Sequence, residues 1–477
     1  MGNLMDRHSP LSPQGALDKQ GKHSLEALGD IWRAAALPDE ALDNVALTGQ
    51  DPVLPSSFAV GAAAQVSIAA AGLAAAELWH LRGQPRQRVM VDMLQAAQEC
   101  RGHFTINGVA PPQWDKISGA YPCGDGGWVR IHAKFAHHRD GALALLGCPT
   151  GEGGTREAVA AALQGWKALE FEQVAAYAGL VVAAMRSFQS WDAHPQARAL
   201  ANQPLVSIER IDAADPRPLP HYGPELARPL QGIRVLDLTR IIAGPIAGRT
   251  LAAYGADVML VNAPHLPNID NIIETSQGKL SAYADLETAD GRIALGNLLR
   301  RAHVFVQGYR PGGLEALGFG AQEAARIRPG IVYVSLSAYG SEGPWARRRG
   351  FDSLVQTATG LNQADPKPLP MQILDYASGF LMAFGAQAAL MRQATEGGSW
   401  HVRVSLARTG MWLRSLGRVT DGLACPMPPI GALLATTQSG FGTLSAVQHA
   451  AQFSATPAIW TRPSVPPGTH PTVWPFQ

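Results

Sequence analysis

One carboxylate and a few arginines have residue types and positions that could do chemistry. Asp375 lies at the start of an apolar run, rich in Ala and Gly, that predicts a long helix over 376–395. The N-terminus of a helix presents free backbone N–H groups and the positive end of the helix dipole, which favour an ionised carboxylate and could stabilise an oxyanion. Asp375 is therefore either an attacking carboxylate or a simple helix N-cap.

The composition limits what such a site can bind. The chain has 477 residues, of which 46% are hydrophobic and 16% are charged, as expected of a folded protein of two or three domains. Its 39 Lys and Arg residues balance 38 Asp and Glu residues, giving a formal net charge of +1. This balance gives no electrostatic case for nucleic acid or for an anionic membrane as a partner. An anionic ligand must therefore be held by a local cluster of cations.

The cysteines and the N-terminal sequence suggest a reducing compartment. No two cysteines form a CxxC pair, so we expect neither a metal site nor a disulfide framework. The first 15 residues lack the apolar segment of a secretory signal, and we expect a cytoplasmic location. The run 58–78 is dominated by Ala and Gly and contains Gln65 and Glu77, which indicates a buried helix and not a membrane span.

The second half of the chain alternates short apolar strands with helices. Strands are predicted over 233–238, 258–261, 303–306 and 331–336, with helices over 244–254 and 291–302. This alternation predicts an α/β fold with an open, doubly wound parallel sheet of the Rossmann-like kind. No G-x-G-x-x-G motif follows the first strand, so a nicotinamide or flavin dinucleotide site is not supported.

The first half predicts a smaller α+β domain. A strand–turn–strand pattern spans 121–131, and helical patterns follow over 156–166, 170–178 and 194–202. The stretch 212–229 is rich in Pro and polar residues, which is typical of a linker. We therefore expect an N-terminal tail and helix over 1–50, an Ala-rich helix with the small domain over 51–211, a linker over 212–229, and the larger domain over 230–477.

An internal repeat connects the two halves. A shift of 313 residues aligns 62–93 with 375–406 without gaps and gives seven identities, among them Gly72 with Gly385 and Val89 with Val402. Both segments show an Ala-rich helix, a polar turn and an alternating strand. The same shift pairs Asp375 with Ala62, and no Asp occurs between Pro52 and Val91. We therefore expect one candidate site per chain.

Several motifs of the second half occur together in one known family. In order, they are GIRVLDLTRIIAGPIAGRTLAAYGADVMLVNAP over 232–264, Gly278-Lys279 with Asp285-Leu286, Tyr309-Arg310-Pro311-Gly312 with Leu317-Gly318, SLSAYGSEGP over 335–344, Gly350-Phe351-Asp352, QTATGL over 356–361, and Ile373-Leu374-Asp375 ahead of Ser378-Gly379. This order resembles the class III CoA-transferases, the family of formyl-CoA transferase, carnitine CoA-transferase and α-methylacyl-CoA racemase. Segments 88–97, 121–128, 198–211 and 454–474 resemble later parts of the same family, so the order of parts is rearranged and the central helix occurs twice.

The resemblance implies a function and a set of residues. It implies transfer of CoA between carboxylic acids, with Asp375 as the catalytic nucleophile that forms an aspartyl anhydride and thioester. CoA esters would be substrates, with no cofactor bound covalently, and a carboxylic acid would be the acceptor. The phosphates of CoA would lie near the residues Arg240, Ala243, Gly244, Pro245, Lys279, Arg310 and Arg347. Since relatives form interlocked dimers, we expect a homodimer or an internal pseudo-dimer in which helices 58–82 and 376–395 pair through their small residues.

Three departures from the family pattern keep alternatives open. Asn262 replaces the acid after the second strand, and Leu280 replaces the second basic residue after Gly278. Both favour a catalytically weak acyl-CoA-binding paralogue or a subunit that stabilises a partner. Phe351 precedes Asp352 where the racemase branch has a histidine, and an apolar ring cannot exchange an α-proton, so racemase activity is disfavoured.

Overall fold

A computed structural model describes residues 13–112, 114–220, 222–364 and 368–475. Its largest element is a seven-stranded sheet in the order β10-β9-β8-β11-β12-β13-β7, parallel throughout except for the antiparallel edge strand β7. The strands are β8 (Arg234–Leu238), β9 (Asp257–Asn262), β10 (Lys279–Tyr283), β11 (Val304–Gln307), β12 (Val332–Ser337), β13 (Ser399–Ser405) and β7 (Ser207–Asp212). The parallel strands reverse their order between β8 and β11, which confirms the doubly wound α/β sheet.

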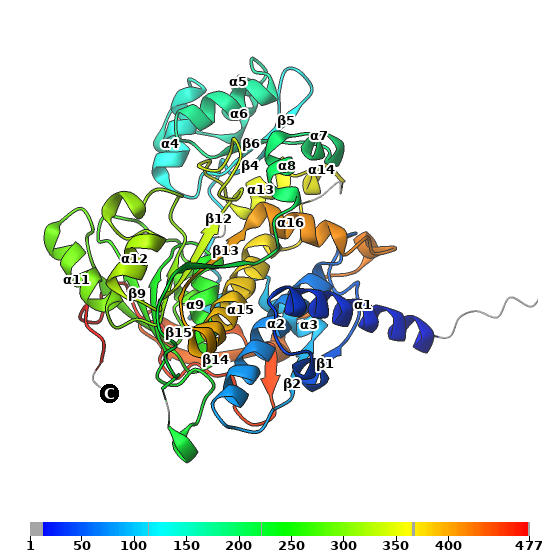
Figure 1. The fold of residues 1–477 in the computed structure, drawn as a ribbon. Helices are drawn as coiled ribbons and strands as arrows, with labels where there is room; N and C mark the ends of the chain where they lie inside the picture. Colours follow the sequence, from blue (N-terminus) through cyan, green and yellow to red (C-terminus); the bar gives the residue numbers. More distant parts are fainter. Residues whose placement is uncertain (1–12, 113, 221, 365–367, 476–477) are drawn as a thin grey trace, which may run out of the picture.

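Both faces of this sheet are buried, and the strand residues divide between them. Val304 and Val306 pack with helices on one face, whereas Phe305 between them packs on the other. This follows because successive strand side chains point to opposite faces. The helices on the first face are α9 (Ala243–Ala253) and α15 (Ile373–Glu396), and those on the second are α11 (Ala289–Leu299) and α12 (Ala321–Ile327) (Figure 1).

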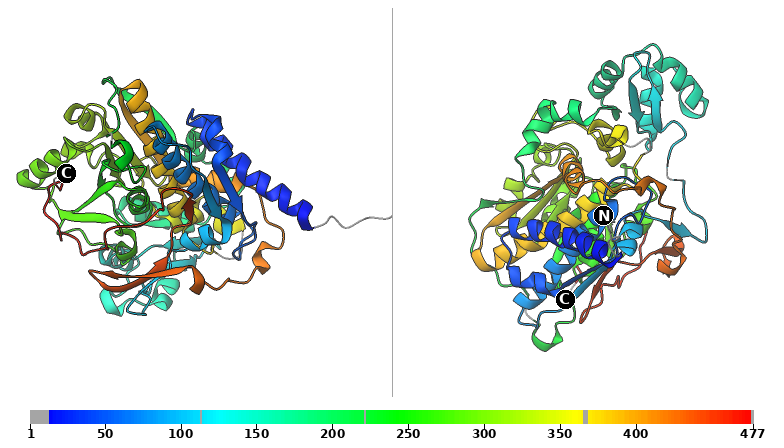
Figure 2. Two further views of the ribbon diagram at one scale, coloured as in Figure 1. Left: turned by 90° about the horizontal axis from the view of Figure 1, so that it is seen from below. Right: turned by 90° about the vertical axis from the view of Figure 1, so that its right-hand side faces the viewer.

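A smaller α+β domain lies at one end of the molecule, at the top of Figure 1 and the upper right of the second view in Figure 2. Its antiparallel sheet consists of β4 (Gly119–Pro122), β5 (Trp128–Ile131) and β6 (Val182–Ala184). Helices α4 (Ala136–Leu145), α5 (Arg156–Leu163) and α6 (Ala168–Tyr177) give it a core of its own. Helices α7 (Phe188–Asp192) and α8 (Pro195–Ala201) lead back to strand β7 of the large sheet.

The N-terminal segment builds a second, shorter unit against the large domain. It contains α1 (Pro13–Ala34), β1 (Val45–Thr48), α2 (Val60–Leu81), β2 (Val89–Asp92) and α3 (Met93–Glu99). β2 pairs in parallel with β1 and antiparallel with β16 (Ala451–Phe453), as β13 pairs with β12 and β7. A third small sheet contains β14 (Leu434–Ser439), β15 (Gly442–Val447) and β3 (Phe104–Ile106).

Helices α2 and α15 pack against each other in the main core. The side-chain amide of Gln387 on α15 donates to the carbonyl oxygen of Ala71 on α2 at 3.0 Å. Both helices are long and apolar enough to cross a membrane, but each is buried along its apolar length by the rest of the chain. They are therefore core helices, as the sequence predicted for the first of them.

The prediction that the two long helices meet through small residues is wrong for Gly72 of α2 and Gly385 of α15. A Cβ on Gly72 would meet Val89 of β2 at 3.0 Å, and a Cβ on Gly385 would meet Val402 of β13 at 2.5 Å. Each glycine thus lets its helix approach the strand that follows it in sequence. The two helices meet through other faces.

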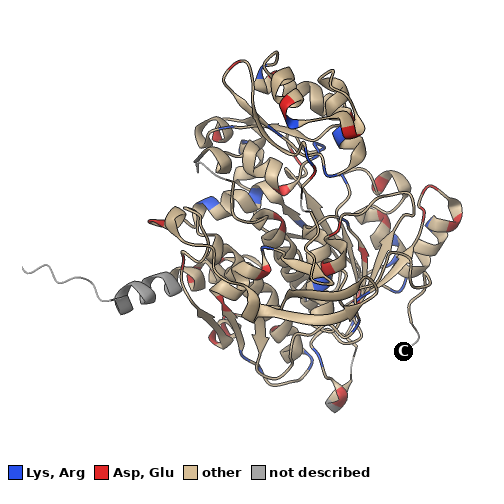
Figure 3. Cartoon of the chain, turned by 180° about the vertical axis from the view of Figure 1, so that it is seen from behind, with Lys and Arg blue, Asp and Glu red and all other residues tan. Residues whose placement is uncertain are grey.

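Four shorter α-helices remain in the described chain. They are α10 (Ile272–Thr275), α13 (Asp352–Ala358), α14 (Leu361–Ala364) and α16 (Leu406–Ser415). Of these, α13 packs against the sheet of the small domain. Figure 3 shows Lys, Arg, Asp and Glu interspersed over the visible side. A charged ligand must therefore be bound by a local cluster of charge, as the net charge of +1 predicts.

Candidate active site

Asp375 lies in the first turn of α15 and is 5% exposed. One turn further along the same face stands Gly379, where a Cβ would meet the carbonyl oxygen of Ala243 at 2.5 Å. Only a residue without a side chain fits there, so α15 can approach the first turn of α9 closely. This contact brings Asp375 to the edge of the sheet where β8 ends.

A second buried carboxylate accepts a hydrogen bond from the backbone of Asp375. Asp352, in the first turn of α13, is fully buried and its Oδ2 accepts a hydrogen bond from the backbone N–H of Asp375 at 3.0 Å. Its Oδ1 accepts another from the side chain of Gln356 at 2.5 Å. Burial raises the pKa of Asp352 to about 7, although these hydrogen bonds favour its ionised form.

The environment makes Asp375 a weak acid. Burial and, after it, the charge of Asp352 raise the pKa of Asp375 well above its usual value. Since Asp352 accepts hydrogen bonds that favour its charge, the proton of this pair belongs on Asp375. The expectation that the helix N-terminus keeps Asp375 ionised is therefore wrong, because desolvation and a like charge outweigh the helix dipole.

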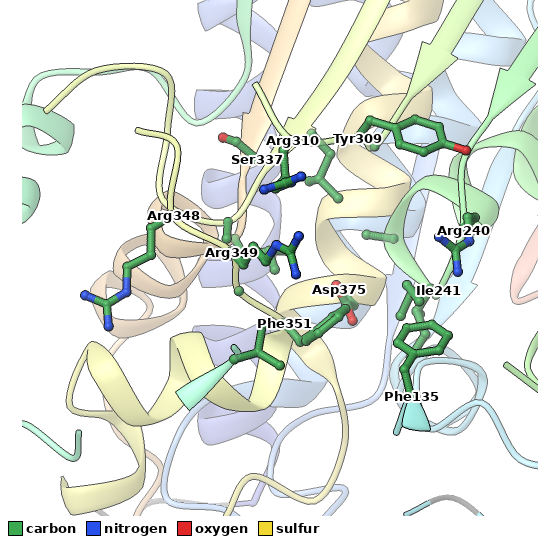
Figure 4. A pocket seen from close by; sticks show the side chains of 18 of the residues that line it. Phe135, Arg240, Ile241, Tyr309, Arg310, Ser337, Arg348, Arg349, Phe351 and Asp375 are labelled. Atoms are coloured by element: carbon green, nitrogen blue, oxygen red, sulfur yellow. The ribbon is translucent and has the colours of Figure 1, made fainter. Parts of the chain in front are cut away.

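A cavity of about 380 Å³ opens onto Asp375 at the point where the strand order of the sheet reverses (Figure 4). Its wall includes Leu238 at the end of β8 and Arg240 after it, and Tyr309 and Arg310 after β11. Open α/β sheets bind ligands at this switch point, at the carboxyl ends of their strands. Three of the residues predicted from the sequence to hold a ligand, namely Arg240, Ala243 and Arg310, thus share one cavity with Asp375.

The arginines of this first cavity differ in whether their guanidinium groups already have partners within the chain and in whether they face the cavity. Arg240 lies over the ring of Phe135 at 5.3 Å and donates to the carbonyl of Pro267, and burial lowers the pKa of its guanidinium. Arg310 is exposed at the rim, with its side chain directed into the cavity in Figure 4. Arg349 donates to the carbonyl of Gly179 at 2.7 Å, and Figure 4 shows the guanidinium of Arg348 turned away.

The other four predicted ligand residues lie outside this first cavity. The Nζ of Lys279 is buried, 2.8 Å from Asp237 Oδ2 and 2.8 Å from the carbonyl oxygen of Pro245. Lys279 therefore links α9 to β8. Gly244 packs against Thr239, which a Cβ would meet at 2.5 Å. Arg347 is exposed, whereas Arg348 and Arg349 line the cavity.

The small domain contributes residues that sequence reasoning missed. Phe135, His137 and His138 line the first cavity, and His132 stacks on Phe351 with ring centroids 4.2 Å apart. Burial lowers the pKa of His132 to about 3 and that of His138 to about 4, so both are neutral near pH 7. The sequence signal was the dense run of basic and aromatic residues over 132–139, which follows directly after β5.

The loop between the two sides of the site has a strained backbone. Ile241 has a φ of 79°, which is rare for a β-branched residue. It lines the first cavity and also a second cavity of about 280 Å³. Both cavities share Asp375, Phe135, Ile242 and Phe351. Strained backbone persists at functional sites where the surrounding structure holds it. Here the strained residue Ile241 lines both cavities, and both also reach the carboxyl group of Asp375.

Comparison with known proteins identifies the family. The sequence model of CoA-transferase family III matches residues 230–424. An "Acyl-CoA transferase" of Gibberella moniliformis is 31% identical over 423 residues, covering 78% of this chain and 74% of that protein. The chain therefore belongs to CoA-transferase family III, a family of enzymes of the transferase class.

Other relatives match a smaller part. A "Probable fatty acyl-CoA transferase" of Mycobacterium tuberculosis is 32% identical over 209 residues, which cover 40% of this chain and 53% of that protein. A crystal structure of that mycobacterial protein shows 33% identity over 40% of this chain and 56% of its own, with a TM-score of 0.38. The chain thus spans about half the length of this relative and about three quarters of the fungal one.

Proposed function

We propose that this protein transfers CoA from an acyl-CoA to a carboxylic acid through Asp375. The observation that carries the proposal is the position of Asp375, a buried carboxyl group at a helix N-terminus where two cavities meet. One of these cavities is rimmed by arginines and lies at the switch point of the sheet. CoA esters are the substrates, and no resident cofactor takes part.

The chemistry proceeds by exchange at carbonyl carbon. The carboxylate of Asp375 attacks the thioester carbonyl, the C–S bond breaks, and an aspartyl–acyl anhydride and CoA thiolate form. The thiolate then attacks the aspartyl carbonyl, which gives an aspartyl–CoA thioester and releases the first acid as its carboxylate. The incoming carboxylate attacks this thioester and the thiolate returns to the new acyl carbonyl, so Asp375 is regenerated.

Asp352 is a positioning residue in this scheme. Its hydrogen bond from the N–H of Asp375 fixes the first turn of α15. Its charge also raises the pKa of Asp375, and a carboxylate of higher pKa is a stronger nucleophile once it has lost its proton. The reaction therefore needs Asp375 to lose its proton before it attacks the thioester.

Arg240 and Arg310 are proposed to contact the phosphates of CoA. They follow the adjacent strands β8 and β11 and line the same cavity as Asp375. Guanidinium groups form charge-assisted, frequently bidentate hydrogen bonds with phosphate oxygens. The thioester end of the ligand would then lie at Asp375.

We further propose that the chain arose by internal duplication and has one active site. The shift of 313 residues takes the first residue of α2 onto that of α15 and the first residue of α3 onto that of α16. The contact of Gly72 with Val89 corresponds to that of Gly385 with Val402. Because Ala62 occupies the position of Asp375, the first copy is a scaffold and the two copies form an internal pseudo-dimer.

The test is transfer of CoA from an acyl-CoA to an isotopically labelled acid. The wild type should form labelled acyl-CoA, and Asp375→Ala should abolish transfer while retaining binding of CoA. Transfer by Asp375→Ala would overturn the assignment. A non-catalytic acyl-CoA-binding protein would bind CoA through the same arginines, yet it would form no labelled product with any acid in the panel.

A further inference from the structure

The second cavity carries an excess of positive charge next to Asp375. It is about 280 Å³ in volume and lined by Arg101, Arg130 and Lys134, together with apolar side chains such as Ile269 and Met371. Among the described residues that line it, Asp375 is the only acid. An acyl chain bound there would thus lie between apolar walls and a group of cations.

Arg130 is the most buried of the three cations of this cavity, and the opposite charge near it is that of Asp352, which lies outside the cavity lining. Lys134 donates to the carbonyl oxygen of Pro112 and lies 3.5 Å from Asp270, and Arg101 donates to the side chain of Gln98 at 2.8 Å. Arg130 is 9% exposed, and the described residues offer its buried Nε no hydrogen-bond partner. A buried guanidinium stays charged and gains most from an anion brought to it by a ligand.

Neutral polar atoms converge on the same space. Within the described part of the chain, His132 Nδ1, Ser353 Oγ and Tyr376 Oη are buried and have no hydrogen-bond partner. All three side chains line the second cavity. Buried polar groups in native proteins are nearly always satisfied, so several unsatisfied groups around one cavity indicate a polar ligand. The hydroxyl of Tyr376 is held against Gly102, where a Cβ would lie 1.9 Å from it.

We propose that the second cavity binds the acyl group and selects a short acid with a second carboxylate, which Arg130 holds while the reacting carbonyl lies at Asp375. This proposal rests on the proposed function, since it names the class of acid transferred at the same site. The size of the cavity favours a short chain, because ligand pockets usually measure about 300–1,000 Å³. The first cavity remains for CoA itself.

The activity test compares succinyl-CoA with butyryl-CoA, whose acyl chains have equal length and differ in the terminal carboxylate. We expect wild-type kcat/KM to favour succinyl-CoA at least tenfold. Arg130→Gln should remove most of this preference by raising KM for succinyl-CoA, with little change for butyryl-CoA, and Arg130→Lys should restore part of it. The matched control is Arg326→Gln, which removes an exposed cation of α12 and should keep the wild-type preference.

A binding test separates this inference from the proposed function. Free succinate should raise the Tm of wild type and of Asp375→Asn more than butyrate does, and Arg130→Gln should lose this difference. If both thioesters react equally and Asp375→Asn abolishes both reactions, the acid class is wrong and the transferase function stands. If neither thioester reacts and succinate still gives the Arg130-dependent shift, the function is wrong and the dicarboxylate site stands. Equal shifts with both acids would overturn the site.

Discussion

The backbone N–H of Asp375 donates to Asp352 Oδ2 at 3.0 Å, so a buried carboxylate directly supports the helix turn that carries the candidate nucleophile. The N-terminal half contains the same device, since the carboxylate of Asp51 accepts from the N–H groups of Gly61 and Ala62 at 3.1 and 2.9 Å. Ala62 corresponds to Asp375 under the shift of 313 residues. A carboxylate that accepts from the first turn of the long helix, Asp51 or Asp352, is thus present in both halves. The candidate nucleophile Asp375 has no counterpart in the first half, where Ala62 stands.

The stability of the wild type should fall with rising pH relative to that of Asp375→Asn. The pKa values of Asp352 and Asp375 are raised in the folded state, so the folded protein holds protons that the unfolded chain releases near its usual pKa. The contribution of these two carboxyl groups to the free energy of unfolding is therefore fully present below about pH 4, and it is lost as pH rises through about 7 and beyond. In thermal unfolding, the Tm of Asp375→Asn minus that of wild type should increase by several degrees between about pH 5 and about pH 8. A pH-independent difference would contradict the raised pKa.

Replacement of Asp352 should shift the pH dependence of catalysis. Asp352→Asn removes the neighbouring negative charge and thereby lowers the pKa of Asp375, so the acidic limb of the kcat/KM profile should move about one pH unit or more lower. The control is Asp290→Asn, which changes an exposed first-turn aspartate of α11. A purely structural role of Asp352 would lower activity at every pH without moving the limb.

Loss of either phosphate-binding arginine should weaken binding more than chemistry. Arg240→Gln and Arg310→Gln should each raise the KM for CoA esters about tenfold with a smaller change in kcat, since contacts made equally in ground and transition state affect KM. Acyl thioesters of N-acetylcysteamine lack the phosphates and should react equally with wild type and both variants. An unchanged KM in both variants would mean that CoA binds elsewhere.

Gly379 should tolerate no side chain. Gly379→Ala forces the new methyl group against the carbonyl oxygen of Ala243, and we expect a loss of about 1–3 kcal/mol in the free energy of unfolding, with reduced activity from displaced Asp375. Gly296→Ala on α11 is the matched control, because no atom lies within 4 Å of its added Cβ. Chemical denaturation should show this control unchanged or stabilised by up to about 1 kcal/mol. Equal stability of both variants would refute the close approach of α15 to α9.

The sequence predicted the elements that depend on local pattern. The strands predicted over 303–306 and 331–336 form β11 and β12, because burial on both faces of a parallel sheet leaves a continuous apolar run. The Ala-rich run after Ser57 forms the buried helix α2. The internal repeat predicted that the two long helices pack together, and α2 and α15 do so in the main core. Its small residues did not reveal which faces meet, because a glycine serves a helix–strand contact as well as a helix–helix contact.

The chemistry of the site depends on contacts between distant segments, which a single sequence does not show. Lys279 was expected to bind phosphate because it is a cation. Its ammonium group is instead paired in the core with Asp237, which lies 42 residues away in the sequence. The acidity of Asp375 depends on its burial and on Asp352, 23 residues away. Arg130 comes from the small domain, and only the packing of that domain on the large one places it near Asp375.

Trapping of the activated carboxyl group of Asp375 tests its role as the nucleophile most directly. Wild type is incubated with an acyl-CoA panel in the presence of hydroxylamine, which converts an aspartyl anhydride or thioester into a hydroxamate, and the peptides are analysed by mass spectrometry. We expect a hydroxamate at Asp375 that depends on acyl-CoA and is absent from Asp375→Asn. CoA transfer without any modification of Asp375, or a hydroxamate at another residue, would contradict this expectation.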